Sequence, residues 1–276
     1  GFCRNRAFFM KKNSTSAIGI FDSGLGGLSI LKEISNRLPN EELIYLADSD
    51  NAPYGEKPKE HIIEISRKNT EFLISKNCKL IVVACNTATT NAISILRNNY
   101  NIPFIGIEPA IKPAALNSKN ACIGVLATKG TLSSDLFAET TKKFTSHTKV
   151  IEVEGKGIVE AIESNASNTI GFEQLLKNQL KPFVEAKIDT LVLGCTHYPF
   201  IVPQIRKCLG NEVIIIDSGF AVARQTDRIL QNLQLKVITK KSQKPSLNVY
   251  TNKTSKDALL NILENLKIDQ YKQFDL

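Results

Sequence analysis

Two cysteines stand in matching positions, each directly after a predicted β-strand. Cys85 follows the apolar run 80–84 and precedes a predicted helix, while Cys195 follows the apolar run 190–194 and has His197 two residues further on. A helix N-terminus lowers the pKa of a thiol from its usual value of about 8.5, so a thiolate would be usable near neutral pH. One buried cysteine is more often a packing residue. Two equivalent strand-end cysteines favour a chemical role.

Other polar side chains also follow predicted strands. Asp22 and Ser23 come at the end of the first strand, and Thr128 comes at the end of a later one. Ligands of open α/β sheets bind beyond the carboxyl ends of the strands. We therefore expect these three side chains to converge with the two cysteines.

Two loops next to these strand ends have more than one interpretation. The segment 22–28 (DSGLGGL) could bring backbone N–H groups close to an anionic group such as a carboxylate, or it could be a glycine turn made for packing. It lacks the GxGxxG and GxxxxGK[ST] patterns of nucleotide sites. The segment 52–55 (APYG) could form one wall of a cleft, or it could be a plain turn.

The remaining cysteines and histidines receive no chemical role. The six cysteines include no CxxC pair, which favours neither a disulfide framework nor a zinc site and indicates a reducing compartment. We interpret three cysteines as packing residues, one as part of an N-terminal leader, and two histidines as surface residues; in that order they are Cys78, Cys122, Cys208, Cys3, His61 and His147.

The elements that must position these residues read as alternating strands and helices. Short Ile- and Val-rich runs recur at 16–22, 42–48, 79–85, 104–109, 121–128, 149–155, 190–195 and 213–218. This alternation predicts right-handed βαβ units and parallel sheets. The runs are continuously apolar, which is typical of strands covered by helices on both faces. Further along, we expect helices at 220–233 and 258–266, a strand at 247–250, and a polar surface loop at 240–245.

A weak internal repeat divides the chain into two similar halves. The run beginning at Ile18 matches the run beginning at Ile123, and the strand before Cys85 matches the strand before Cys195. The sequence therefore predicts an α/β fold of two similar doubly wound domains related by a pseudo-two-fold axis, each with a mainly parallel sheet, and a site in the cleft between them. We expect the first domain at 17–108 plus 219–276, the second at 109–218, and a disordered leader or tag at 1–16.

Length and charge exclude several other classes of protein. With 276 residues, 42% hydrophobic and 22% charged, the chain has the composition of a folded globular protein. The net charge of +8 is spread along the chain without a run of five or more basic residues, so we expect no nucleic-acid partner. No apolar stretch reaches the roughly 18 residues of a membrane span, and no signal peptide is recognisable. We expect no membrane association.

Five segments resemble the matching motifs of glutamate racemases, in the aspartate/glutamate racemase superfamily. They are IFDSGLGGLSIL, ADSDNAPYGEK, VVACNTATTNA, IGIEPAIKPA and LVLGCTHYPF, and the resemblance covers about residues 17–225. It implies two α/β domains, a cytoplasmic enzyme that interconverts L- and D-glutamate without a cofactor or metal, and a supply of D-glutamate for peptidoglycan, and hence for the cell wall and cell shape. A homodimer is a family-level expectation.

The resemblance also implies roles for individual residues. Cys85 and Cys195 would be the two acid/base groups, with Asp22 and His197 assisting them, and Glu163 best matches a further assisting glutamate. The remaining residues would line the substrate site: Ser23, Tyr54, Gly55, Asn86, Thr87, Thr128, Thr131 and Thr196, together with Asp22 and His197.

Inversion of an α-carbon explains why two thiols would be needed. One proton leaves one face and another arrives on the opposite face, so one sulfur starts as thiolate and the other as thiol. Domain closure around the substrate is a further hypothesis. Two alternatives stay open at this point: a racemase, isomerase or decarboxylase acting on aspartate or a related acid, and a non-catalytic amino-acid-binding or thiol-sensing module.

Overall fold

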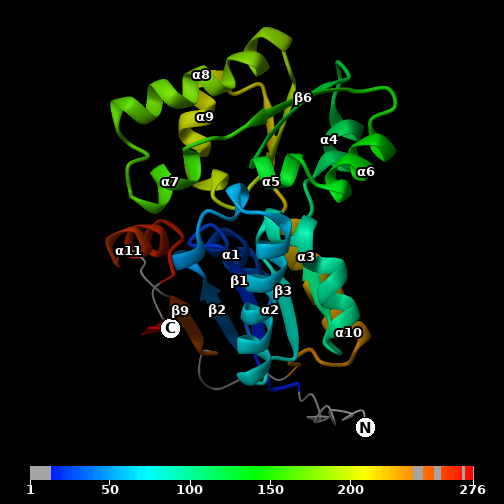
Figure 1. The fold of residues 1–276 in the computed structure, drawn as a ribbon, viewed down its shortest axis with the longest axis vertical. Helices are drawn as coiled ribbons and strands as arrows, with labels where there is room; N and C mark the ends of the chain where they lie inside the picture. Colours follow the sequence, from blue (N-terminus) through cyan, green and yellow to red (C-terminus); the bar gives the residue numbers. More distant parts are fainter. Residues whose placement is uncertain (1–13, 239–244, 252–255, 269–270, 276) are drawn as a thin grey trace.

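The described residues form two parallel β-sheets, each covered by helices, in two lobes that lie one above the other (Figure 1). The computed structural model describes residues 14–238, 245–251, 256–268 and 271–275. Two predicted features, the leader at 1–16 and the loop at 240–245, therefore lie largely outside the described residues.

The first sheet has the strand order β10-β9-β2-β1-β3-β4, and all its pairings are parallel. Its strands are β1 (Ile18–Asp22), β2 (Leu43–Ala47), β3 (Leu80–Val83), β4 (Phe104–Gly106), β9 (Leu247–Thr251) and β10 (Lys272–Asp275). Its helices are α1 (Leu28–Arg37), α2 (Lys59–Ser75), α3 (Asn86–Asn99), α10 (Gly219–Asn232) and α11 (Lys256–Asn265), with 3₁₀ turns η1 (Ser49–Asn51) and η2 (Tyr54–Glu56).

The second sheet has the order β6-β5-β7-β8 and is also parallel. Its strands are β5 (Cys122–Ala127), β6 (Lys149–Glu154), β7 (Thr190–Gly194) and β8 (Ile214–Ile216). Its helices are α4 (Ile111–Asn117), α5 (Lys129–Leu132), α6 (Asp135–Phe144), α7 (Ile158–Glu163), α8 (Ile170–Ala186) and α9 (Val202–Leu209), with the 3₁₀ turn η3 (Tyr198–Ile201).

Alternation along the central strands explains why both faces of each sheet need helices. In β1, Ile18 and Ile20 pack with residues of α1 and α10 on one face, while Phe21 packs with residues of α2 and α3 on the other. Successive side chains of a strand point to opposite faces, so continuously apolar strands bury apolar side chains on both. The predicted α/β fold in two domains is confirmed.

The two sheets share one strand order. The first sheet contains the order β2-β1-β3-β4, and the second has the matching order β6-β5-β7-β8. β1 therefore corresponds to β5 and β3 to β7, as the internal repeat predicted. The residues that follow β3 and β7, Cys85 and Cys195, occupy corresponding places at the carboxyl ends of the two sheets. The short edge strand β10 is the one strand that was not predicted from the sequence.

The chain passes between the lobes twice, and the two crossings are joined. Ser218 Oγ donates a hydrogen bond of 2.6 Å to the backbone oxygen of Glu108. After the second crossing, α10 returns to the first lobe and packs against α1 and β4. The exact domain boundaries, 109 and 218, stay a prediction. No helix in the described part of the chain is both long and apolar enough to cross a membrane.

Candidate active site

A small cavity lies where the carboxyl ends of the two sheets face each other. Its volume is about 20 Å³, which is roughly the space of one water molecule. Ten of the residues proposed from the sequence line it: Ser23, Tyr54, Gly55, Cys85, Asn86, Thr87, Thr128, Cys195, Thr196 and His197. Both cysteines thus face one shared cavity, the first from the lobe of β3 and the second from the lobe of β7.

Cys85 is the N-cap residue of α3. The backbone N–H of Ala88 donates to its sulfur at 3.4 Å, and the thiol lies 3.8 Å from Ser23 Oγ. Burial raises the pKa of Cys85 well above its ordinary value, and the nearby Asp22 carboxylate raises it further, while the helix amide of Ala88 lowers it. The predicted net lowering by the helix N-terminus is therefore wrong for Cys85, because desolvation outweighs the single amide contact.

Cys195 lies beside an imidazole. Its sulfur is 3.7 Å from His197 Nδ1, and His197 Nε2 is 2.7 Å from Glu163 Oε1. Burial lowers the pKa of His197, but the hydrogen bonds with Cys195 and Glu163 outweigh burial and raise the pKa well above its ordinary value. His197 is thus held as an imidazolium between a sulfur and a carboxylate. It is placed to give a proton to that sulfur or to take one from it.

Asp22 lies behind the cavity wall and is fully buried. Its carboxylate accepts hydrogen bonds from the backbone N–H of Gly27 at 2.8 Å and from the hydroxyl of Thr196 at 3.5 Å. Burial raises the pKa of Asp22 to about 6, against the opposing effects of His197 and the Gly27 amide. A carboxyl group with that pKa can change protonation close to neutral pH.

The glycine loop serves contacts within the protein. Three of its amides donate to carboxylates of the protein, Gly24 and Gly27 to Asp22 and Leu25 to Glu163 at 2.6 Å, while the Gly26 amide faces His197 Nε2 at 3.2 Å. The interpretation that the loop binds a substrate carboxylate is therefore wrong, because protein carboxylates occupy these three amides.

Close approach explains the glycines themselves. A Cβ atom at Gly24 would overlap the Glu163 carboxylate, and one at Gly26 would overlap the His197 ring. The loop is therefore the place where the first lobe receives these two side chains of the second.

Hydroxyl groups join the lobes on another side of the cavity. Thr87 Oγ1 of α3 lies 2.8 Å from Thr128 Oγ1, the N-cap residue of α5, and Thr128 Oγ1 lies 3.0 Å from Thr131 Oγ1. Thr131 itself is not in the cavity wall. Next to them, both side-chain amide atoms of Asn86 are buried and have no hydrogen-bond partner among the described residues. Asn86 therefore offers a donor and an acceptor to a polar ligand.

Two further residues line the cavity, Pro53 and Val159. Pro53 belongs to the 52–55 turn, and its place directly before Tyr54 and Gly55 could have identified it. Val159 is an apolar residue of α7 with the same spacing as its core neighbours, so no sequence signal separated it from a packing residue. Glu163, from the same helix, does not line the cavity but reaches His197 behind it.

The chain is similar to known proteins both in sequence and in structure. A family model for Asp/Glu/hydantoin racemases matches residues 19–226. A glutamate racemase from Ralstonia pickettii is 45% identical over 221 residues, which is 80% of this chain and 78% of that protein. A glutamate racemase structure from Bacillus anthracis has a TM-score of 0.85 at 32% identity, covering 96% of this chain and 98% of the other. A Francisella tularensis glutamate racemase in complex with D-glutamate has a TM-score of 0.80 at 30% identity, covering 94% and 96%.

Proposed function

The chain belongs to the Asp/Glu/hydantoin racemase family, and we propose that it interconverts L- and D-glutamate without a cofactor, with Cys85 and Cys195 as opposed acid/base groups. The observation that carries this proposal is that both thiols line one cavity from corresponding strand ends of two lobes. Recognition of an amino acid needs neither sulfur, whereas inversion of an α-carbon needs a proton carrier on each face.

Proton transfer balances between the two sulfurs. A thiolate on one side takes the α-proton of glutamate, leaving a carbanion-like centre, and the thiol on the other side gives its proton to the opposite face of the same carbon. The raised pKa of Cys85 supports a resting enzyme in which this sulfur holds its proton. His197, beside Cys195, is the partner through which the second sulfur gains or loses a proton. The roles exchange in the reverse direction.

The negative charge that develops on the substrate carboxylate has to be stabilised by fixed donors. Asn86, with its unpartnered amide, and the hydroxyls of Ser23 and Thr87 supply such donors around the cavity. Preorganised donors in a site without bulk water stabilise developing charge more strongly than water does. The role of Asp22 and Glu163 in this proposal is to hold the protonation and orientation of the groups next to the sulfurs.

Substrate entry requires the lobes to separate. A cavity of about 20 Å³ has room for about one water molecule, so it cannot admit glutamate without a change of shape. The two crossings joined at Glu108 and Ser218 are the natural pivot, and the contact between Thr87 and Thr128 has to open. Solution X-ray scattering with and without D-glutamate tests this closure, and identical curves would contradict it.

The decisive experiment measures racemisation directly. Purified protein with reductant, L-glutamate and no added cofactor should lose optical activity, as followed by circular dichroism, and in D₂O the D-glutamate formed should carry deuterium at the α-carbon. Product that keeps its original proton would indicate internal transfer by one base. A parallel assay with aspartate and other acids decides substrate choice, and preferential turnover of aspartate would overturn the assignment to glutamate.

We further propose a cytoplasmic enzyme that supplies D-glutamate for peptidoglycan. The two sulfurs work only as free thiols, and Cys78, Cys85, Cys122, Cys195 and Cys208 are all unpaired in the structure. A reducing compartment keeps thiols in that state. The homodimer expected from the family stays a prediction, and gel filtration with light scattering measures it.

A further inference from the structure

We propose that Asp48 is a positioning residue for glutamate racemisation: it fixes the Tyr54–Gly55 wall of the catalytic cavity through the Tyr54 hydroxyl, without touching the substrate. This inference rests on the proposed function and assigns a role to a carboxylate that the mechanism above does not use. Asp48 follows β2, the strand next to β1, and its backbone N–H donates to the backbone oxygen of Asp22 at 3.0 Å.

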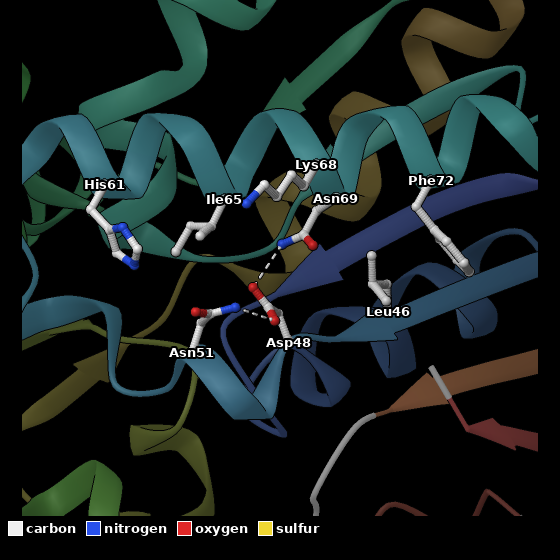
Figure 2. A pocket seen from close by; sticks show the side chains of 8 residues that line it. All are labelled: Leu46, Asp48, Asn51, His61, Ile65, Lys68, Asn69 and Phe72. Atoms are coloured by element: carbon white, nitrogen blue, oxygen red, sulfur yellow. Dashed lines mark hydrogen bonds between the residues drawn. The ribbon is translucent and has the colours of Figure 1, made fainter.

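The Asp48 carboxylate is the acceptor of a small buried network. Tyr54 Oη donates to it at 2.5 Å, Asn69 Nδ2 at 3.3 Å and Asn51 Nδ2 at 2.9 Å. Asn69 Nδ2 also donates to Tyr54 Oη at 2.9 Å. Figure 2 shows Asp48 between Asn51, from η1, and Asn69, from α2. Asp48, Tyr54 and Asn69 are only 5%, 1% and 8% exposed, so these bonds form away from bulk water.

The network lies at the wall of a second cavity. Asp48, Asn51 and Asn69 line a different cavity, of about 240 Å³, between η1 and α2, whereas Tyr54 lines the catalytic cavity. Burial raises the pKa of Tyr54 well above its ordinary value and Asp48 raises it further, so the phenol keeps its proton and can donate it. The Tyr54 hydroxyl is thus engaged by Asp48 and Asn69, while Tyr54 also lines the catalytic cavity.

A displaced Tyr54 would move more than its own ring. The next residue, Gly55, packs so closely against Thr128 of the second lobe that a Cβ atom at Gly55 would lie 2.8 Å from Thr128 Cβ. Gly55 and Thr128 both line the catalytic cavity. The position of residues 54–55 therefore sets one wall of the cavity and one contact between the lobes. Misplacement of about 1 Å costs an enzyme up to about 100-fold in rate.

Steady-state kinetics of four variants test this role. Asp48→Ala and Tyr54→Phe should each lower kcat/KM for glutamate by about 10-fold, mainly through KM, because the wall holds substrate before and during reaction. Because both variants break the same bond, the double variant should lose no more than either single one. Asp48→Asn keeps an acceptor oxygen for Tyr54 and should restore kcat/KM to within about 3-fold of wild type.

Asp227→Asn is the matched control for stability. Asp227 is a mostly buried carboxylate of the same lobe that accepts from Arg37 and Lys236, and it does not line the catalytic cavity. It should lower the melting temperature but leave KM unchanged. Unchanged KM and kcat in Asp48→Ala, or losses that multiply in the double variant, would overturn the positioning role. If Asp48→Ala fails to fold, Asp48→Asn and Tyr54→Phe decide by the same criteria.

A binding measurement distinguishes a failure of this proposal from a failure of the proposed function. The shift of melting temperature caused by D-glutamate reports its affinity without turnover. A wild-type protein that binds glutamate but does not racemise it would refute the function, and the weaker shift expected in Asp48→Ala would then decide the positioning role alone. A wild-type protein that neither binds nor racemises glutamate overturns both.

Discussion

The Oε1 atom of Glu163 lies 2.7 Å from Nε2 of His197, although the two residues stand on different elements of the second lobe. Glu163 ends α7 and His197 follows β7. The same oxygen also accepts the backbone N–H of Leu25 from the first lobe at 2.6 Å. One carboxylate therefore holds the imidazole beside Cys195 and joins it to the opposite lobe.

This contact predicts that Glu163→Gln lowers activity through His197. The substitution keeps the size of the side chain but removes its charge, so the pKa of His197 should fall. We expect kcat to drop by about 10- to 100-fold, since a residue that orients and charges an acid/base partner contributes on that scale. NMR titration of the His197 ring checks the pKa and circular dichroism checks turnover. Glu173→Gln, at an exposed carboxylate paired with Lys207, is the control. A His197 pKa unchanged in Glu163→Gln would contradict the assignment.

Isotope exchange should distinguish the roles of the two sulfurs. Cys85→Ser or Cys195→Ser should lower racemisation by about three orders of magnitude or more, because a serine hydroxyl is a much weaker acid than a thiol. Each variant keeps one thiol, so each should still exchange the α-proton of one enantiomer with D₂O, and the two variants should differ in which enantiomer they exchange. NMR of both enantiomers measures this. Cys208→Ser, on α9, should behave as wild type, and near-normal racemisation in either strand-end variant would remove that sulfur from the mechanism.

The pKa of Asp22 predicts a pH dependence of stability with an unusual sign. Its pKa is about 6 in the folded protein and 3.8 in the unfolded chain, so the folded state binds more protons between these values. The free energy of unfolding should therefore fall as pH rises from about 4 to 6, by about 3 kcal/mol at most from this group. Asp22→Asn lacks the decrease. Urea denaturation of both proteins at pH 4 and pH 7 gives the difference.

The pKa of Asp227 is shifted in the opposite direction to that of Asp22, so Asp227 provides a comparison. Burial raises its pKa, but Lys236 and Arg37 outweigh burial and lower the pKa below the ordinary value. Its contribution to stability is present above pH 3.8 and is lost as pH falls below that value. Asp227→Asn should therefore be less stable than wild type at both pH values. A wild-type advantage over Asp22→Asn that grows from pH 4 to pH 7 would contradict the assignment for Asp22.

The sequence predicted the site better where the residues sit at strand ends than where they sit on helices. Cys85, Cys195 and Thr128 follow continuous apolar runs, and parallel strands bring their carboxyl ends to one edge, so their convergence could be predicted. Val159 carries no such signal, because one apolar residue on an amphipathic helix looks like any other. Glu163 came only from family resemblance.

The electrostatics could not be predicted from sequence, because they depend on burial. A helix N-terminus after Cys85 was correctly predicted, yet its effect on the thiol is smaller than that of desolvation and of Asp22. The glycine loop had the composition of an anion site, but carboxylates of the protein occupy its amides. In both cases the local pattern was right, but burial in the first and carboxylates of the protein in the second determined the outcome.

A buried ion pair at the opposite end of the first sheet could not be predicted from the sequence either. Lys79 Nζ lies 2.5 Å from Glu41 Oε2, and their side chains are 0% and 1% exposed. Lys79 Nζ also donates to the backbone oxygens of Ser14 and Leu235, and the backbone N–H of Val237 donates to Glu41 Oε1. The pair therefore ties the segment before β1 to the segment after α10, far apart in sequence.

Removing one member of this pair should destabilise the first lobe strongly. Lys79→Met leaves the Glu41 carboxylate buried without its cation, which costs about 3–5 kcal/mol in the free energy of unfolding. The double variant Lys79→Met, Glu41→Leu should recover most of the loss, because no charge stays buried. Urea denaturation followed by circular dichroism measures both, with Lys68→Met at an exposed pair with Glu64 as the control, which should change stability by less than about 0.5 kcal/mol. Racemisation per folded molecule should be unchanged in all three, since the pair lies away from both sulfurs. A double variant as unstable as Lys79→Met would show that packing, and not the unpaired charge, causes the loss.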